Sequence, residues 1–328
     1  MRLILWVCLA LGVLWGGYWF VGSNAAQHGV LRLFETASAQ GITASNRGVS
    51  VSGFPNRFDL TVTAPHLADP VSGWGWQASF AQVFSMTWKP WHLIAALPND
   101  QEIDAPGQKI ALQSSRMMGS LLLQPSTDLT LEEAVVEAEG LAVQSDQGWH
   151  FGAAKAVLAL ARDATQQNTQ HVGVELTNVA PDSSLTTLLP ALGATVQTVH
   201  LDATLMLTAP LDRHAGEVLP KLMGVRLADF HANWGSLKIA AQGVVEAGVD
   251  GVAQGKIDFR IEDWQEIPKL VVALGLVRPE MGQTIERGLN VLAQSGSDPK
   301  VLILPLTFAE GRMNLGPLPL GPAPLLHQ

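Results

Sequence analysis

A cationic and an anionic side chain stand two residues apart in the stretch GVSVSGFPNRFDLTVTAP at residues 48–65. Arg57 and Asp59 follow a Phe-Pro-Asn break, and the apolar residues change from odd to even positions across it. A strand cannot change parity without a turn or a bulge, so the pattern predicts a turn at residues 53–56. The two charges then share a strand face, either as an ion pair, which is favoured, or as a charged functional site. The predicted structural signature consists of Phe54, Pro55, Arg57, Phe58 and Asp59.

A further candidate for metal or hydrolytic chemistry is the pair His200 and Asp202. Both would lie on the polar face of an alternating strand at residues 199–209, where a distant third ligand could complete a metal site. A solvated strand face explains the same pattern more simply. The chain contains neither G-x-S-x-G nor G-x-x-x-x-G-K-[ST], so it has no serine-hydrolase elbow or P-loop motif. We therefore expect no catalytic residue, no metal and no cofactor.

An aromatic stripe runs through WGWQASFAQVFSMTW at residues 74–88, where apolar side chains occupy most even positions. Such alternation is typical of a half-buried strand. This face has two interpretations. It can be the inner face of a sheet packed against helices, or part of it can line a groove for an acyl chain or another hydrophobic ligand. The residues of this groove hypothesis are Trp74, Trp76, Phe80, Phe84 and Trp88.

The elements that must position these residues are mainly strands. Residues 256–261 alternate cleanly and are expected to pair with residues 237–245. Helical spacing is found at residues 264–277 and again after Pro279. The pattern predicts an α+β, β-dominated fold, with a long curved antiparallel sheet wrapped around a few short amphipathic helices and preceded by one N-terminal transmembrane helix.

Three segments are expected along the chain. They are a transmembrane anchor at residues 1–23, a β-rich domain at residues 24–315, and a proline-rich tail at residues 316–328 that should be extended without ladder bonds. In two places a short Leu-rich helix follows paired strands and precedes another long strand. This weak internal repeat predicts two similar halves, at about residues 24–165 and 166–315.

The N-terminal run at residues 3–22 is uncharged and has the length that a helix needs to cross about 30 Å of hydrocarbon. Arg2 precedes it, which favours a cytoplasmic N-terminus, and an aromatic cluster at residues 15–19 would meet the membrane interface. A cleaved signal peptide is the alternative, since small residues follow at 23–26. The length of the run and its bulky end favour an uncleaved single-pass anchor, with the bulk of the chain outside the cytoplasm.

The composition excludes some partners. The 328 residues carry a net charge of −9, and without a basic stripe to hold phosphates we expect no nucleic-acid partner. Charged residues make up 15%, below the ~25% usual in soluble domains, which indicates much buried or partner-covered apolar surface. The single cysteine, Cys8, lies in the N-terminal run, so the rest of the chain can form no disulfide.

The G-F-P-x-R-F-D-L core at residues 53–60 resembles the signature of an uncharacterised family of alphaproteobacterial envelope proteins, a domain of unknown function. The resemblance covers nearly the whole chain, including NWGSLKIAAQG at 233–243, GKIDFRIEDW at 255–264 and the ending LPLTFAEGRMNLGPLPLGPAP. This family has no assigned activity, so the resemblance implies no catalytic residues. The last third is also similar in style to large envelope proteins implicated in outer-membrane assembly and phospholipid transport.

Together these observations predict a non-enzymatic protein that residues 3–22 anchor in the inner membrane, with its bulk in the periplasm. It would bind an apolar ligand such as a lipid, or scaffold envelope partners. Two alternatives stay open: an envelope hydrolase with a dispersed Asp/His/Ser site, and a structural module with no ligand. A continuous apolar trough would favour lipid binding, a polar cleft at His200 and Asp202 the hydrolase, and a filled core the structural module.

Overall fold

The computed structural model describes residues 1–327 except 216–218, 276–277, 295, 297 and 317. The chain divides into two compact units, which we call unit 1 (Met1–Pro125 and Val136–Trp149) and unit 2 (Ser126–Val135 and His150–Gln328). Among the described residues are twenty strands and four α-helices. The predicted β-dominated α+β fold with an N-terminal apolar helix is therefore confirmed.

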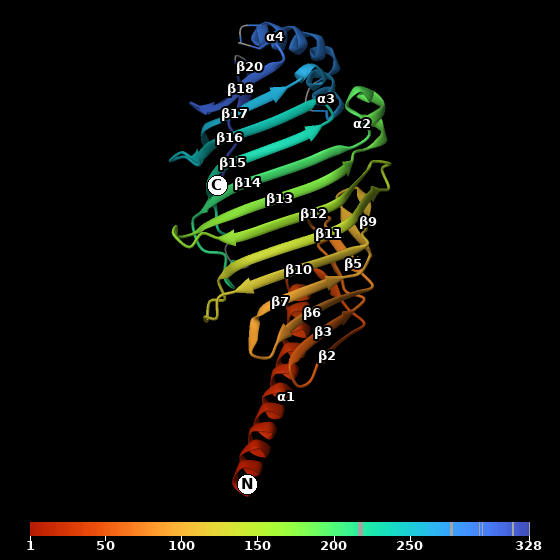
Figure 1. Cartoon of the computed structure of the whole chain (residues 1–328), viewed down its shortest axis with the longest axis vertical. Coiled ribbons are helices and arrows are strands. Elements are labelled where there is room, and N and C mark those ends of the chain that lie inside the picture. Colours follow the sequence, from red (N-terminus) through yellow and green to blue (C-terminus); the bar gives the residue numbers. More distant parts are fainter. Residues whose placement is uncertain (216–218, 276–277, 295, 297, 317, 328) are drawn as a thin grey trace. The chain divides into compact units, whose positions relative to one another are not determined.

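Unit 1 consists of the helix α1 (Arg2–Ala39) and an antiparallel meander whose long strands are divided by bends. On one side of the bends the strands pair in the order β2–β3–β6–β7–β10 (Figure 1). On the other side they pair in the order β1–β4–β5–β8–β9–β11. The strands are β1 (Thr43–Ser45), β2 (Gly48–Ser52), β3 (Arg57–Thr63), β4 (His66–Ala68), β5 (Gly75–Ala78), β6 (Phe80–Met86), β7 (Lys89–Leu97), β8 (Asp100–Ala105), β9 (Gln108–Gln113), β10 (Arg116–Leu123) and, from residue 136 onward, β11 (Leu131–Ser145).

The bends of unit 1 have local causes in the sequence. Pro65 and Pro98 lie at two of them and have no N–H for a ladder bond. Ala64 adopts a left-handed conformation with φ 46°, and its N–H donates to the Ser79 carbonyl at 2.9 Å. The single strand predicted at residues 74–88 is consequently wrong in one respect: it is two strands, β5 and β6, which are separated at Ser79.

The second half of α1 covers one face of the unit 1 sheet. The helix extends well beyond the predicted run at residues 3–22 and ends at Ala39. Its residues Ala26, Val30, Leu31 and Phe34 pack against the buried Val49, Leu60 and Val62 of β2 and β3. Helix and sheet approach closely at Gly22, where a Cβ atom would lie 2.6 Å from the Phe58 ring. This packing uses the even positions of β3, as the parity change predicts.

Unit 2 is a second antiparallel meander, in which each strand from β12 to β20 pairs with the next. The pairing expected between residues 256–261 and 237–245 is confirmed. The strands are β12 (His150–Arg162), β13 (Thr169–Ala180), β14 (Val196–Leu207), β15 (Leu222–Trp234), β16 (Leu237–Ala247), β17 (Ala253–Glu262), β18 (Val301–Ala309), β19 (Arg312–Leu315) and β20 (Leu318–Pro322). The helices are α2 (Ser183–Leu188), α3 (Ile267–Ala273) and α4 (Gly282–Gln294), with 3-10 turns at Pro190–Leu192, Trp264–Glu266 and Pro279–Met281.

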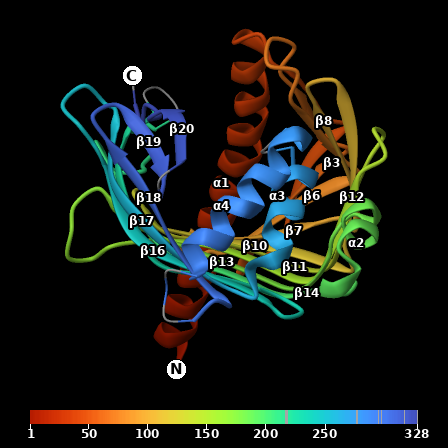
Figure 2. The same cartoon turned by 90° about the horizontal axis from the view of Figure 1, so that it is seen from above.

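The core of unit 2 lies where these short helices meet β15 to β18 (Figure 2). Trp234 and Trp264 are both buried, and their Nε1 atoms donate to the carbonyls of Gly193 at 3.0 Å and Pro299 at 3.1 Å. The core cluster also contains Leu189, Leu192, Leu237, Ile261, Leu289, Ala293, Leu302 and Leu304. The predicted helix after Pro279 is confirmed, and the one before it ends at Ala273; its predicted residues 276–277 lie outside the described residues.

The proline-rich tail is a correction to the sequence-based expectation, because it does form ladder bonds. Strand β20 pairs with β19, and Ala253 N–H donates to the Pro324 carbonyl at 2.9 Å. A proline cannot donate, but its carbonyl still accepts, and the residues between the prolines keep their N–H groups. Ala323 and Leu326 also pack against the small core formed by Val245, Ala253 and Phe308.

Candidate functional site

The sequence signature at residues 54–59 forms the β2–β3 turn and the first residues of β3. Arg57 Nη2 donates to Asp59 Oδ2 at 2.7 Å, so the predicted ion pair is confirmed. The Arg57 side chain is half exposed, whereas that of Asp59 is mostly buried. Phe58 points to the opposite face and is buried against α1. The signature therefore joins a turn to the N-terminal helix, and its charges stabilise the start of β3.

Aromatic side chains of α1 hold this end of unit 1 through backbone carbonyls. The three hydrogen bonds run from Trp15 Nε1 to Pro55 at 3.0 Å, from Tyr18 Oη to Thr87 at 2.7 Å, and from Trp19 Nε1 to Arg57 at 2.7 Å. The Phe54 ring stands edge-on to Trp19 and stacks on Phe20, with centroids 5.4 and 5.9 Å apart. The aromatic cluster expected at a membrane interface is thus also the contact between helix and sheet.

The tryptophans of the groove hypothesis do not share one environment. Trp74 and Trp88 lie just outside β5 and β6, and their side chains are exposed. Trp76 lies within β5, where its Nε1 atom donates to Gln101 Oε1 of β8 at 2.9 Å. That hydrogen bond ties two strands together, which is a structural use of this indole.

Phe84 does line an apolar pocket, whereas Phe80 is half-buried at the start of β6. The pocket has a volume of about 380 Å³ and lies on the face of unit 1 opposite Phe58 and α1. Its lining is formed by Arg57, Phe84, Ser85, Met86, Lys89, His92 and Ile94. The pocket combines an apolar floor with two cations, a combination that suits an anionic amphiphile.

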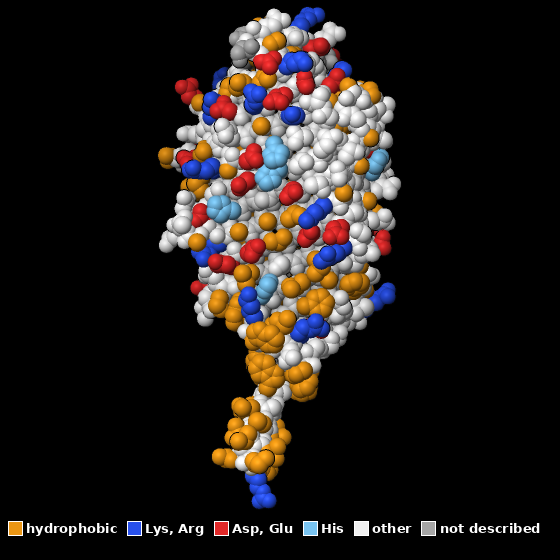
Figure 3. Space-filling model, viewed as in Figure 1, with side chains coloured by type: hydrophobic (Ala, Val, Ile, Leu, Met, Phe, Trp, Pro, Cys, Tyr) orange, Lys and Arg blue, Asp and Glu red, His pale blue; other side chains and the backbone are white. Residues whose placement is uncertain are grey.

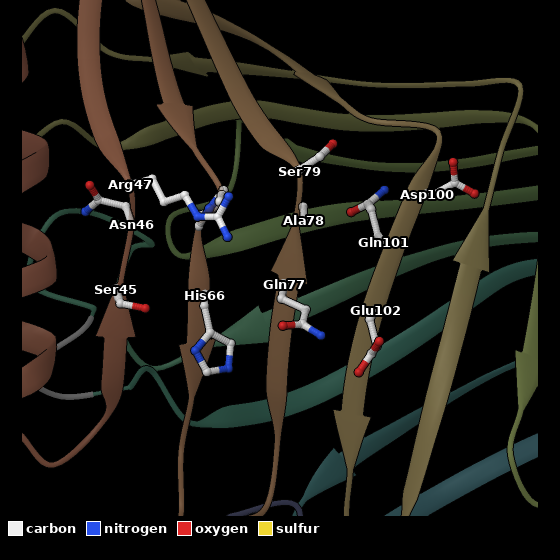
Figure 4. Close-up of a pocket in the computed structure, with 12 residues that line it drawn as sticks. Ser45, Asn46, Arg47, His66, Gln77, Ala78, Ser79, Asp100, Gln101 and Glu102 are labelled. Atoms are coloured by element: carbon white, nitrogen blue, oxygen red, sulfur yellow. The ribbon is translucent and has the colours of Figure 1, made fainter.

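A polar pocket of about 570 Å³ follows the bends of unit 1 (Figure 4). Ser45, His66, Gln77 and Glu102 form one row across β1, β4, β5 and β8, each opposite the next. Lys109 Nζ binds Glu102 at 2.8 Å. Sequence reasoning missed this row because only the strand register brings its members together. It offers hydrogen bonds, but the described part of the chain contains no group of three His, Cys, Asp or Glu side chains that could hold a metal.

His200 and Asp202 lie on the polar face of β14, and β15 supplies their neighbours. His231 lies opposite His200, with the ring centroids 4.8 Å apart, and Asp229 lies opposite Asp202. His231 Nδ1 is 3.0 Å from Asp229 Oδ2. Neither Asp229 nor His231 was identified from the sequence, because a register shift in β15 separates them from a simple alternation.

Two carboxylates of unit 2 have pKa values lowered by local structure. Hydrogen bonds from the side chain and backbone of Thr165 lower the pKa of Asp163 to about 2. Hydrogen bonds from the side chain and backbone of Ser184 lower the pKa of Asp182 to about 2, because Asp182 caps the N-terminus of α2. These are the interactions of a turn and a helix cap, so we interpret both carboxylates as structural.

One face of the unit 2 sheet carries an unbroken apolar row. Its members lie opposite one another from β12 to β18: Leu158, Val174, Leu201, Phe230, Ala241, Phe259 and Leu304. Directly opposite residues share a sheet face. The row on the other face is largely polar and consists of Val157, Glu175, His200, His231, Ala240, Arg260 and Ile303. We call the first set the apolar row.

The helices of unit 2 cover only one end of the apolar row. Leu304 belongs to the helix-covered core, and Phe259 packs against it. At the other end Leu158 is 50% exposed, and Leu201 and Phe230 are half-buried. With strands about 4.8 Å apart, the part from β12 to β15 extends about 14 Å. The sequence predicts this alternation at residues 199–209 and 256–261, but only the register aligns the strands from β12 to β18 into one surface.

The comparison with protein families agrees with the expected membership of an uncharacterised bacterial family. No curated protein matches the chain significantly. A family model matches residues 19–324, which include the packed half of α1 and the strands of both units. The chain therefore belongs to the family described as uncharacterized proteins conserved in bacteria, DUF2125.

Proposed function

We propose that this chain is a membrane-anchored, non-enzymatic protein that binds lipid acyl chains along the apolar row of unit 2, between β12 and β15. The observation that carries the proposal is the register, which places Leu158, Val174, Leu201 and Phe230 opposite one another on a face that the short helices leave uncovered. An uncovered apolar face of this extent is typical of a binding surface.

The chemistry of the row favours an acyl chain over a polar ligand. The flanking positions on the same face are also apolar: Leu160, Val172 and Ala203 on one side, and Ala156, Leu176 and Val199 on the other. These side chains offer no hydrogen-bond donor or acceptor, so a ligand with polar edges would lose its water without compensation. An alkyl chain has no such cost and gains roughly 25 cal/mol for each Å² of apolar surface buried.

The helix α1 would hold the protein at the membrane, which supplies the lipid. Its first turns are apolar and exposed, and it is long enough to cross a membrane. Cleavage near Ala26 would remove Trp15, Tyr18 and Trp19, which hydrogen-bond to unit 1. This contribution to the fold supports an uncleaved anchor. With Arg2 on the cytoplasmic side, the body of the protein would lie in the periplasm.

Site-specific photo-crosslinking in the full chain tests the lipid proposal. Benzoylphenylalanine at position 201 would lie in the apolar row, and the same analogue at position 202 would lie on the opposite face of β14. We expect lipid adducts, detected by mass spectrometry after irradiation of membranes, at position 201 and not at 202. Adducts to a protein at 201 would favour scaffolding instead, and equal labelling at both positions would contradict a specific surface.

A matched pair of exposed residues provides a second test. Leu158 lies in the apolar row, whereas Ile303 is similarly exposed on the opposite face of β18. Leu158→Glu should release lipid that purifies with the protein, and Ile303→Glu should retain it, with little change in melting temperature for either variant. Equal lipid content in both variants would contradict the proposal.

A further inference from the structure

The free part of α1 is too short to cross a bilayer by itself. Trp15 already hydrogen-bonds to the β2–β3 turn, so only residues 2–14 extend clear of unit 1. At 1.5 Å per residue these thirteen residues extend about 20 Å, against about 30 Å of hydrocarbon. Helix tilt would increase the shortfall of about 10 Å. We infer that the end of unit 1 formed by the β2–β3 and β6–β7 turns enters the outer leaflet and completes the span. The inference rests on the proposed insertion of α1.

The side chains at this end suit a lipid environment. Phe54 is 57% exposed in the β2–β3 turn, Trp88 is 57% exposed in the β6–β7 turn, and Met86 is also exposed. Phe20 and Val21 of α1 are exposed beside them. Hydrophobic side chains gather where the bare helix leaves unit 1 (Figure 3). Patches of this kind mark interaction sites, and this one is continuous with the proposed membrane helix.

The depth of this end matches the missing length. Residues 15–21 of α1 run alongside the turns and add about 10 Å of helix. This length places Phe54 in the outer hydrocarbon and the indole of Trp88 near the interface, where tryptophan is enriched. Backbone carbonyls at that depth need partners within the protein. The carbonyls of Pro55, Arg57 and Thr87 have them, since they accept from side chains of α1.

Two cations directly follow the turns that would enter the bilayer. Arg57 and Lys89 flank the apolar pocket that contains Phe84, on the face turned away from α1. Arg57 is paired with Asp59, whereas Lys89 has no ion-pair partner among the described residues. Long cationic side chains extend from an apolar surface to the interface, where anionic lipids attract them. The bilayer, rather than a second protein, is therefore the occupant to which this surface is matched.

Depth-dependent quenching in vesicles tests this inference on the full chain. Cys8 is the only cysteine, so a Cys8→Ser background accepts single probes at chosen positions. An NBD label at Trp88→Cys or Met86→Cys reports on the patch, and a label at Val71→Cys or Val249→Cys reports on sites elsewhere that are even more exposed. Vesicles of phosphatidylcholine and phosphatidylglycerol carry nitroxide-labelled chains. We expect loss of most NBD fluorescence and a blue-shifted emission at positions 86 and 88, and neither change at 71 and 249.

A label on the native Cys8 separates the two proposals. If Cys8 is quenched and positions 86 and 88 are not, α1 inserts while unit 1 stands clear of the bilayer, and this inference is overturned. If Cys8 is not quenched, the anchor itself is wrong. Quenching at 71 or 249 equal to that at 88 would indicate non-specific adsorption and would also overturn it. Lys89→Glu should reduce the quenching at position 88 in anionic vesicles and leave it unchanged in neutral ones.

Discussion

The two units each contain an antiparallel sheet with an apolar face, and they cover that face differently. In unit 1 the long helix α1 packs along β2 and β3 and buries Val49, Leu60 and Val62. In unit 2 three short helices cover the β15–β18 end around Trp234, and Leu158 and Phe230 lie outside this cover and are partly exposed. The comparison teaches that apolar alternation alone does not distinguish a core from a binding surface. What distinguishes them is the presence of a covering element.

The largest expected effect concerns the covered end of unit 2. Trp264 is 2% exposed, and its Nε1 atom donates to the Pro299 carbonyl. Trp264→Ala should leave a cavity and an unpaired carbonyl and reduce the free energy of unfolding by about 3–5 kcal/mol. Trp88→Ala in unit 1 is the control, since removal of an exposed indole should change the free energy of unfolding by less than about 1 kcal/mol. Denaturant unfolding measures both, and equal losses would remove the distinction between covered and uncovered aromatics.

A smaller effect is expected where α1 covers unit 1. A Cβ atom at Gly22 would lie 2.6 Å from the Phe58 ring, so Gly22→Val should push helix and sheet apart. We expect a loss of about 1–3 kcal/mol, as is usual for overpacking. Gly12→Val is the matched control, because nothing lies within 4 Å of a Cβ atom there. Equal stability of the two variants, measured by thermal unfolding in detergent, would mean that α1 does not cover unit 1.

The ion pair at the β2–β3 turn should contribute less. Arg57 is half exposed, so its coupling to Asp59 should lie between about 0.2 and 1 kcal/mol. A double-mutant cycle with Arg57→Ala and Asp59→Ala measures this coupling from unfolding free energies. If Arg57→Ala folds normally but no longer replaces the wild-type protein in the cell, Arg57 would instead belong to a functional site.

The smallest effect is a pH dependence that comes from two carboxylates of unit 2. Asp163 and Asp182 have pKa values of about 2 when folded, below the ~3.9 of an unfolded aspartate. Their contribution to the free energy of unfolding is therefore complete above pH ~4 and is lost as the pH falls towards 2. Carbon-detected NMR titration should give midpoints near 2. Asp182→Asn keeps an N-cap, but it should remove the part of the acid-dependent loss of stability that comes from Asp182. Titration midpoints near 4 would contradict the hydrogen bonds described for the two carboxylates.

Much of the fold was predictable because it depends on local pattern. The turn at residues 53–56, the shared face of Arg57 and Asp59, and the apolar N-terminal helix follow from parity, charge spacing and hydropathy. The expectation that the proline-rich tail forms no ladder bonds was wrong. Proline content predicts which N–H donors are missing, but it says nothing of the residues between the prolines. The two-halves hypothesis stays a prediction.

The candidate sites were less predictable because they depend on register. The aromatic stripe drew attention to unit 1, where Trp76 binds Gln101 within the sheet. The apolar row of unit 2 consists of ordinary leucines, valines and a phenylalanine from strands far apart in sequence. Residue types gave no signal there, since pairing alone aligns them, and a shift of one residue would move each side chain to the other face.

The order of pairing in unit 2 has a consequence for how the protein is made. Each strand from β13 to β20 pairs with the strand before it, so this sheet joins only strands that are neighbours in the chain. A strand that pairs with its neighbour in the chain needs only one connection to close before its native contacts form. A chain that is synthesised from its N-terminal end can therefore add strands one at a time, each on an edge that has already formed. The growing edge is then exposed for one strand length only, which limits the time in which it can pair with another chain.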